Sequence, residues 1–305
     1  MTQNELKEIL EKHQHWLNND CKGWEDMRAN LCGIDLSNLD LQGVDLRYAD
    51  LKGANLRGTN LREANFEGAI LSTAYFDGAD LKRANLSEAI LKGASLEGAD
   101  LDGAELEVVD LRESNLKGAS LKEANLGGTD LEEANLEEVD LRFANLRMAN
   151  LRGTKLKRAN LRGTNFNRAN LDEAELDHSC MKEANLNYAG LNNTSLYLVD
   201  LYRANLKRAN IRRANLSGAE LSEANFEEAN LERVDLRGAN LRRANLRRVN
   251  LEGANLKGAD FEGANLEDTN LRETERTINK IWKFEKRREE LLLNQMYCLT
   301  YKIAQ

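Results

Sequence analysis

The sequence predicts an all-β solenoid, and three observations lead to that prediction. An apolar residue recurs at every fifth position from Leu31 to Leu271, in phase over 49 units. A period of five fits neither an α-helix, with 3.6 residues per turn, nor a β-strand, with a period of two. Glycine gathers at one phase of the repeat, and the 305-residue chain has no proline. A backbone that turns by a constant angle every five residues accounts for the period and for the place of glycine.

Each position of the unit has its own residue preference. Of the 49 central residues 42 are leucine and the rest are also apolar, while alanine stands two residues before the centre in 33 units. The residue between them is mostly Asn or Asp, and the two after the centre are largely Arg, Lys, Glu or Gly. The second of these two positions holds 18 of the 21 glycines, as expected for a turn position where a positive φ is cheap. The inward alanine and leucine side chains must then stack coil on coil, because one unit alone buries almost nothing.

The unit A-[N/D]-L-x-x resembles the motif of the pentapeptide-repeat proteins. The resemblance covers residues 29–273, about four-fifths of the chain, and no insertion interrupts it. It implies a right-handed quadrilateral β-helix in which four units form one square coil. On that basis about 12 coils would form a rod roughly 60 Å long, at ~4.8 Å per coil.

The residues outside the repeat are predicted to be helical. In the N-terminal segment, 1–28, the sequence Thr2-Gln-Asn-Glu5 is a capping box. It opens a helix over 3–18 whose apolar stripe covers the first coil, and Trp24 is expected to help close that end. The residues of the stripe are Leu6, Ile9, Leu10, Trp16 and Leu17.

The C-terminal segment, 274–305, is longer and more apolar than a cap needs. It carries apolar residues at helical spacing, and members of the family that the repeat resembles often dimerise through such a segment. Two interpretations stay open, a cap alone and a homodimer contact. The predicted dimer residues are Ile281, Trp282, Leu292, Met296 and Leu299.

Residues 20 positions apart should stack in columns, which allows the outer faces to be compared. Asparagine fills most of the column 65, 85, 125 to 265, and stacked amides predict an asparagine ladder. On another face a basic column runs beside an acidic one, so the two stripes should pair and cancel, which argues against direct nucleic-acid binding. The basic column is Arg62, Lys82, Lys122, Arg142, Arg162, Lys182 and Arg242, and the acidic one is Asp40, Asp80, Asp100, Asp140, Asp200, Glu220 and Asp260.

The resemblance implies one specific alternative function. Several pentapeptide-repeat proteins are taken to mimic duplex DNA and to bind type II topoisomerases such as gyrase. A 60 Å duplex carries about 35 negative charges, whereas residues 29–273 carry 32 basic and 41 acidic side chains, a net charge of −9. DNA mimicry is therefore the alternative rather than the main interpretation.

Nothing in the sequence indicates catalysis. The histidines are His13, His15 and His178; the first two should point to different sides of their helix. Although His178, Ser179 and Cys180 are adjacent, successive residues of a coil do not converge as a nucleophile and its base must. The four cysteines, Cys21, Cys32, Cys180 and Cys298, lack metal-ligand spacing and are expected to be free thiols in a reducing cytoplasm. We therefore predict no enzyme activity, no cofactor and no metal site.

One stretch breaks the charge pattern. No charged residue stands between Glu183 and Asp200, and outward aromatic side chains on a neutral patch favour protein contact. The sequence thus predicts a cytoplasmic, non-catalytic, rigid scaffold that contacts an unknown protein partner. No apolar run is long enough for a membrane span. The predicted contact residues are Tyr188, Tyr197, Leu198 and Tyr202.

Overall fold

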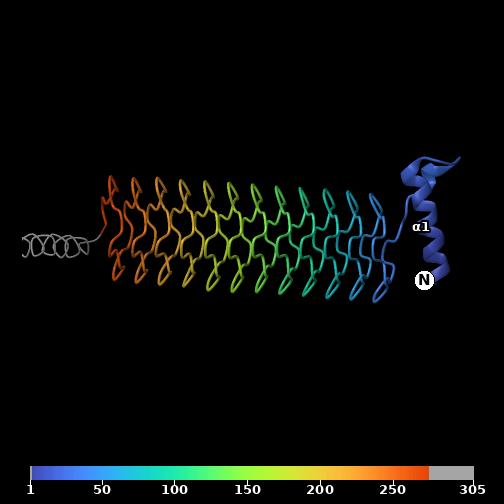
Figure 1. The fold of residues 1–305 in the computed structure, drawn as a ribbon, viewed down its shortest axis with the longest axis horizontal. Coiled ribbons are helices and arrows are strands. Elements are labelled where there is room, and N and C mark those ends of the chain that lie inside the picture. Colours follow the sequence, from blue (N-terminus) through green and yellow to red (C-terminus); the bar gives the residue numbers. More distant parts are fainter. Residues whose placement is uncertain (1, 275–305) are drawn as a thin grey trace, which may run out of the picture.

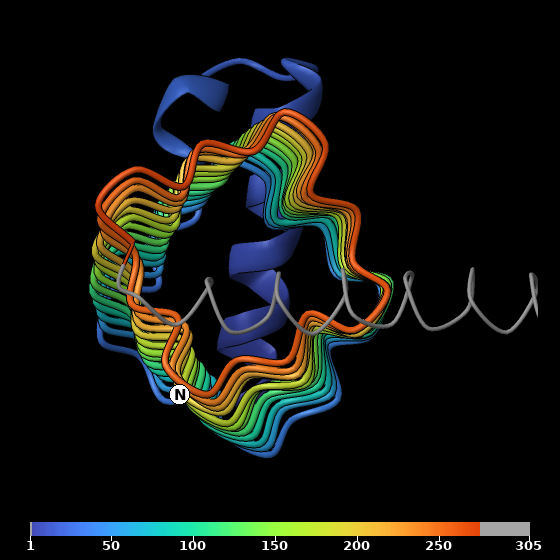
Figure 2. The ribbon, with the colours of Figure 1, turned by 90° about the vertical axis from the view of Figure 1, so that its left-hand side faces the viewer.

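The computed structural model describes residues 2–274, which form a straight rod with a helix across one end (Figure 1). Seen along its axis, the rod is a stack of four-sided coils (Figure 2). The predicted C-terminal segment, 274–305, lies outside the described residues from 275 onward, and so do its predicted dimer residues. The described part of the chain contains no helix long and apolar enough to cross a membrane.

Parallel β-bridges set the register of the coils. From Asn30 to Asn250, every fifth residue is bridged to the residue 20 positions later, ending at the pair Asn250–Asn270. Each coil therefore has four sides of five residues. Each side contributes an isolated bridge rather than a longer strand, because turn residues follow every bridge after one further residue. The predicted solenoid of stacked β-coils is confirmed.

Every backbone N–H of a typical unit has a hydrogen-bond acceptor, as the unit 144–148 illustrates. Asn145 N–H donates to the preceding coil at 2.9 Å, while Leu146 and Met148 donate to the following coil at 2.8 and 3.0 Å. Ala144 N–H closes a four-residue turn at 3.1 Å. The fifth donor, Arg147 N–H, is accepted by the side-chain oxygen of Asn145 at 3.2 Å. Because a buried or half-buried donor without a partner is costly, this bond explains why Asn or Asp precedes the centre.

The same asparagine amides form the predicted ladder. Asn145 Nδ2 donates to Asn125 Oδ1 at 2.9 Å, and Asn165 and Asn185 continue the chain of bonds at 3.3 and 3.1 Å. A second ladder runs along another side, where Asn170 donates to Asn150 at 3.3 Å. Each amide therefore links two coils while its oxygen also satisfies a turn. The predicted asparagine ladder is confirmed.

The core is a stack of layers, and each layer consists of the inward side chains of one coil, mostly leucine and alanine. Central residues from Leu46 to Leu256 are at most 1% exposed, and the alanine positions beside them are nearly as buried. In the first coil, however, the alanine position holds Ile34, Leu39 and Val44. These larger side chains are packed against the core at an end where no coil lies beneath them. The larger residues therefore fill space that a neighbouring coil fills elsewhere.

The second residue after each centre adopts the left-handed backbone conformation in all 49 units. Its φ lies between 54° and 75°, although only 18 of these residues are glycine. A residue with a Cβ pays roughly 1–2 kcal/mol there, so the turn is imposed by the hydrogen bonds of the stack. Glycine is needed for a further reason where a neighbouring side chain lies over it. Phe143 is such a side chain, because a Cβ on Gly163 would lie 2.6 Å from its ring.

The substitution Gly163→Ala is therefore expected to destabilise the rod more than Gly118→Ala. Both glycines have a positive φ, but a Cβ on Gly118 would meet no atom within 4 Å. The extra cost of displacing the Phe143 ring is expected to be about 1 kcal/mol, measured by urea unfolding of both variants. The additional change Phe143→Ala should remove the difference. Equal stability of the two glycine variants would show that the ring moves away freely.

The helix α1 (Gln3–Asn18) caps the first coil, and its N-terminus begins as predicted. The Thr2 hydroxyl oxygen accepts a hydrogen bond from Glu5 N–H, and the Glu5 carboxylate accepts one from Thr2 N–H, so the capping box is confirmed. Leu6 is buried in the core, and Ile9 and Leu10 are packed against it. In Figure 2 the helix lies across the far opening of the coil. The predicted helix over the first coil is therefore present.

Two tryptophans lie at this end of the rod. Trp24 begins the short 3-10 helix η1 (Trp24–Asp26) and is half-buried. The ring that contacts the first coils is Trp16, whose centroid lies 6.3 Å from that of Tyr48 and 5.6 Å from that of His13. Trp16 thus takes part in closing this end, and the closing role expected of Trp24 stays a prediction.

Candidate functional site

The predicted aromatic contact residues lie on three sides of the rod. Tyr197 and Leu198 are neighbours on one side, and both are exposed. Tyr202 follows five residues later, on the next side around one corner, and is half-buried. Tyr188 lies half a coil away from Leu198, and therefore on the opposite side of the rod. The structure brings three of these residues near one corner and leaves Tyr188 apart.

Tyr188 is already engaged by basic neighbours. Arg208 donates a hydrogen bond to its hydroxyl at 2.5 Å, and the guanidinium groups of Arg168 and Arg208 lie 5.7 and 5.6 Å from its ring centre. These arginines come from the coils on either side, because they stand 20 residues away in each direction. A cation on a ring face is a favourable contact in itself. The two arginines therefore hold the Tyr188 side chain within its own column.

The sequence His178-Ser179-Cys180 does not form a catalytic arrangement. His178 is exposed and its ring packs edge-on against Tyr197, with centroids 5.5 Å apart. Ser179 is only 1% exposed and points into the core, where its hydroxyl has no hydrogen-bond partner. Cys180 is a half-buried free thiol on the outer surface. The three side chains thus diverge, as the alternation of the coil predicts.

Among residues 2–274, the most exposed large apolar side chains were not predicted from the sequence. Val108, Met148 and Phe143 are 65%, 59% and 57% exposed. Val108 and Met148 stand in one column, two coils or ~10 Å apart, with the chain's single Gly-Gly pair, Gly127-Gly128, in the coil between them. Phe143 lies on the adjacent side, one unit before Met148. We call Val108, Gly127, Gly128, Phe143 and Met148 the corner surface.

A sequence signal for the corner surface existed. Val108, Phe143 and Met148 all occupy the second position after the centre, which Gly, Arg or Glu usually fills. That position has a positive φ throughout, and its side chain projects from the turn. Apolar residues at this phase are thus exposed by the backbone itself. Sorting residues by phase rather than by charge-free runs would have found them.

The charges beside these surfaces are largely paired. All seven residues of the predicted basic column form ion pairs, five of them with the predicted acidic column, including Arg62–Asp80 at 2.6 Å and Lys182–Asp200 at 3.1 Å. The hydrogen bond from Lys182 to Asp200 raises the pKa of that lysine. Paired stripes present little net field to a distant partner. The predicted cancellation of the stripes is confirmed.

Where serine replaces the usual Asn, an aspartate from the preceding coil accepts the hydrogen bond from the turn N–H that the Asn side chain accepts elsewhere. Asp102 accepts from Ser120 Oγ at 2.6 Å and from Lys122 N–H at 3.0 Å. Burial would raise the pKa of Asp102, but the bonds from Ser120 and Lys122 outweigh it and hold the pKa below its usual value. In the same way, Asp177 accepts hydrogen bonds from Ser195 Oγ and from Tyr197 N–H, where an Asn at position 195 would otherwise accept the latter. These aspartates are therefore structural.

Comparisons with known proteins agree with the repeat. The family model "Pentapeptide repeats" matches residues 27–272 in overlapping segments. A solved structure of HetL, a pentapeptide repeat protein involved in heterocyst differentiation regulation in the cyanobacterium Nostoc sp. strain PCC 7120, is 34% identical. That match covers 80% of this chain and 87% of HetL, with a TM-score of 0.30.

Two further solved structures are similar over part of the chain. QnrB1, a plasmid-mediated fluoroquinolone resistance protein, is 17% identical over 75% of this chain and 92% of its own, with a TM-score of 0.28. A pentapeptide repeat protein from the Arabidopsis thaliana thylakoid lumen is 33% identical over 36% of this chain and 66% of its own, with a TM-score of 0.15. No curated protein matches the chain.

Proposed function

Because the chain belongs to the pentapeptide-repeat family, we propose that it is a non-catalytic scaffold that presents a rigid surface to a protein partner. The observation that carries this proposal is the corner surface, where three large apolar side chains are more than half exposed beside a pair of glycines. Exposed apolar groups gathered in one place are typical of contact surfaces. Because the coil stack fixes the backbone of these residues, binding carries no entropy cost for ordering a loop.

The predicted residues Tyr197, Leu198 and Tyr202 form a second proposed contact. Leu198 lies over Gly218, since a Cβ there would be 2.7 Å from its Cδ2. Tyr202 has the Arg203 guanidinium 4.9 Å from its ring centre. Tyrosine and arginine are enriched at protein interfaces. Tyr188 lies on the opposite side of the rod and is therefore outside this second contact.

The experiment is a comparison of two paired variants in capture from a lysate of the source organism. Phe143→Ser with Met148→Ser removes the corner surface, and Tyr197→Ser with Tyr202→Ser removes the second contact. We expect the first pair to reduce capture of the partner at least tenfold with an unchanged melting temperature. Tyr75→Ser, at a 40% exposed residue on the side of the rod opposite Met148, serves as the matched control.

Salt dependence separates this proposal from DNA mimicry. A contact that buries apolar area should change little between low and moderate salt, whereas a mimic of duplex DNA works through charge and should weaken steeply. The same titration is run with purified DNA gyrase as the bait. Capture that survives the serine variants and disappears at moderate salt would replace the apolar contact with an electrostatic one.

A further inference from the structure

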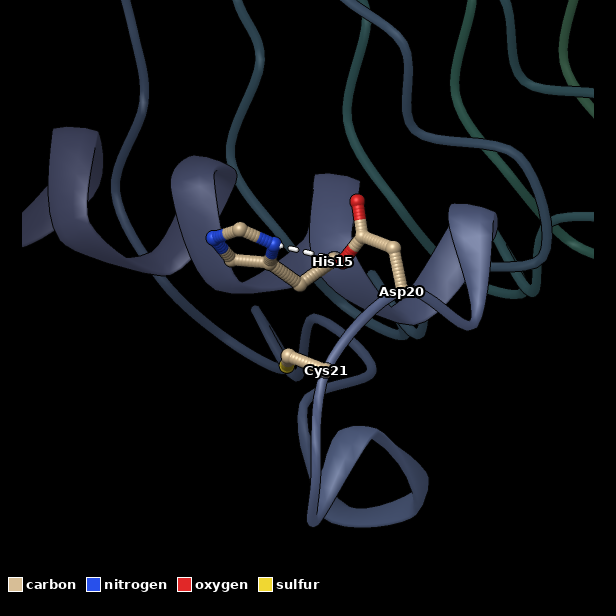
Figure 3. Close-up of side chains that lie close together, drawn as sticks. All are labelled: His15, Asp20 and Cys21. Atoms are coloured by element: carbon tan, nitrogen blue, oxygen red, sulfur yellow. Dashed lines mark hydrogen bonds and ion pairs between the residues drawn. The ribbon is translucent and has the colours of Figure 1, made fainter.

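Three potential metal ligands meet where the chain leaves α1 (Figure 3). His15 stands in the last turn of the helix, and Asn19, with a φ of 52°, reverses the chain immediately after it. The reversal brings Asp20 and Cys21 back to the histidine. One nitrogen, one oxygen and one sulfur atom of these residues all lie within 4.8 Å of one another. All three side chains are exposed or half-buried, so an ion can reach them from solvent.

A second sulfur atom adjoins the group. Met27 Sδ accepts a hydrogen bond from Cys21 Sγ at 3.7 Å. Two sulfur ligands that are each ~2.3 Å from a tetrahedral zinc ion lie about 3.8 Å apart. The separation of the two sulfur atoms thus already suits a shared ion. Met27 follows η1 directly and is half-buried, so its position is set by the turn that leads into the first coil.

The contact between His15 and Asp20 must lengthen slightly to hold the same ion. His15 Nδ1 lies 2.7 Å from Asp20 Oδ1, within one hydrogen bond. Nitrogen and oxygen ligands of a tetrahedral ion lie about 3.3 Å apart, with metal bonds of ~2.0–2.1 Å. Opening this contact by about half an ångström replaces the hydrogen bond by two metal bonds. Because both side chains are exposed and end in rotatable bonds, the movement meets little resistance.

We propose that His15, Asp20, Cys21 and Met27 bind a zinc-type divalent ion at the foot of α1. Imidazole, carboxylate and thiolate are the ligands that zinc takes in proteins, and thiolate with thioether excludes magnesium and calcium. The ion joins the last turn of α1 to the segment that enters the first coil. Its binding therefore stabilises the docked helix, because an ion that binds only the folded end shifts that equilibrium toward it.

Cobalt is the probe, because a thiolate bound to Co²⁺ gives a charge-transfer band that other ligands do not. The protein used is the full chain with Cys32, Cys180 and Cys298 changed to serine, which leaves Cys21 as the single thiol. We expect the band to saturate at one Co²⁺ per chain and to disappear when Zn²⁺ is added. We also expect Zn²⁺ to slow hydrogen exchange in α1 and to leave the middle of the rod unchanged.

Four variants in the same background test the ligands. Cys21→Ser should abolish the band, His15→Gln and Asp20→Asn should weaken Co²⁺ binding at least tenfold, and Met27→Leu at least threefold. His178→Gln, at an exposed histidine elsewhere, should bind as the parent does. A missing band, a band that survives Cys21→Ser, or equal affinity after His15→Gln would overturn the site. An unchanged Co²⁺ affinity of the Met27→Leu variant would show that Met27 is not a ligand.

Discussion

Replacing Leu146 by aspartate is expected to unfold the middle of the rod at urea concentrations that leave the parent folded. Leu146 is 0% exposed, and the residues stacked on it in the neighbouring coils, Leu126 and Phe166, offer no partner for a charge. A carboxylate buried without a partner is strongly destabilising, and we expect a loss of more than about 4 kcal/mol in the free energy of unfolding. Because each coil contacts only its neighbours, the damage should spread from this coil.

The measurement is urea unfolding combined with hydrogen exchange along the chain. Leu146→Met is the matched control, because it keeps the volume apolar and should cost less than about 1.5 kcal/mol. Exchange should rise first in the coils next to residue 146 in the aspartate variant. If Leu146→Asp unfolds at the same urea concentration as Leu146→Met, the inward direction of the central residues is refuted.

Loss of the His13 ring is expected to detach α1 from the rod. His13 is 0% exposed, and it makes two hydrogen bonds that fix its tautomer. Ala29 N–H donates to Nδ1 at 3.1 Å, so Nδ1 carries no proton, and Nε2–H donates to the Arg47 carbonyl at 3.1 Å. His13→Ala leaves both backbone groups without a partner and opens a cavity. We expect a loss of about 2–4 kcal/mol in docking of the helix.

Acid should have the same effect without a mutation. Burial lowers the pKa of His13, and the bond to the Arg47 carbonyl and the carboxylate of Asp45, which favour the charged ring, do not offset it. Arg28 and Arg47 add to the decrease. The undocked state therefore binds the proton more readily than the docked state. Docking should be at full strength above about pH 6.5, the ordinary pKa of histidine, and should be lost as the pH falls below it.

Hydrogen exchange of the α1 amides reports the docking, measured from pH 8 to pH 5 with a chelator present to exclude bound metal. Exchange rates are corrected for their intrinsic pH dependence with His13→Ala, whose α1 should be unprotected at every pH. His178→Gln should follow the parent, since His178 is exposed and far from the cap. Constant protection of α1 down to pH 5 would show that the docked ring accepts a proton.

The sequence determined the fold because the repeat is local and unbroken. An apolar centre every five residues with a small residue two positions earlier leaves one packing solution, a coil with both inside. The asparagine ladder followed from the same register, since amides 20 residues apart must stack. The capping box was readable because Thr2 and Glu5 interact within one turn of the helix. In each case the interacting residues are separated by a fixed and known number of positions.

The tertiary structure alone decided which outward side chains contact one another. The 20-residue register already places Tyr188 and Leu198 on opposite sides, but it does not show that the Tyr188 ring lies near two guanidinium groups or that the Tyr197 ring packs against His178. The direction of a side chain at a positive φ was equally unreadable, as Phe143 over Gly163 shows. Outside the repeat no register exists, so the meeting of His15 with Cys21 depended on the turn at Asn19. A periodic sequence fixes what is buried, but proximity on its surface depends on the angle through which each residue turns the chain.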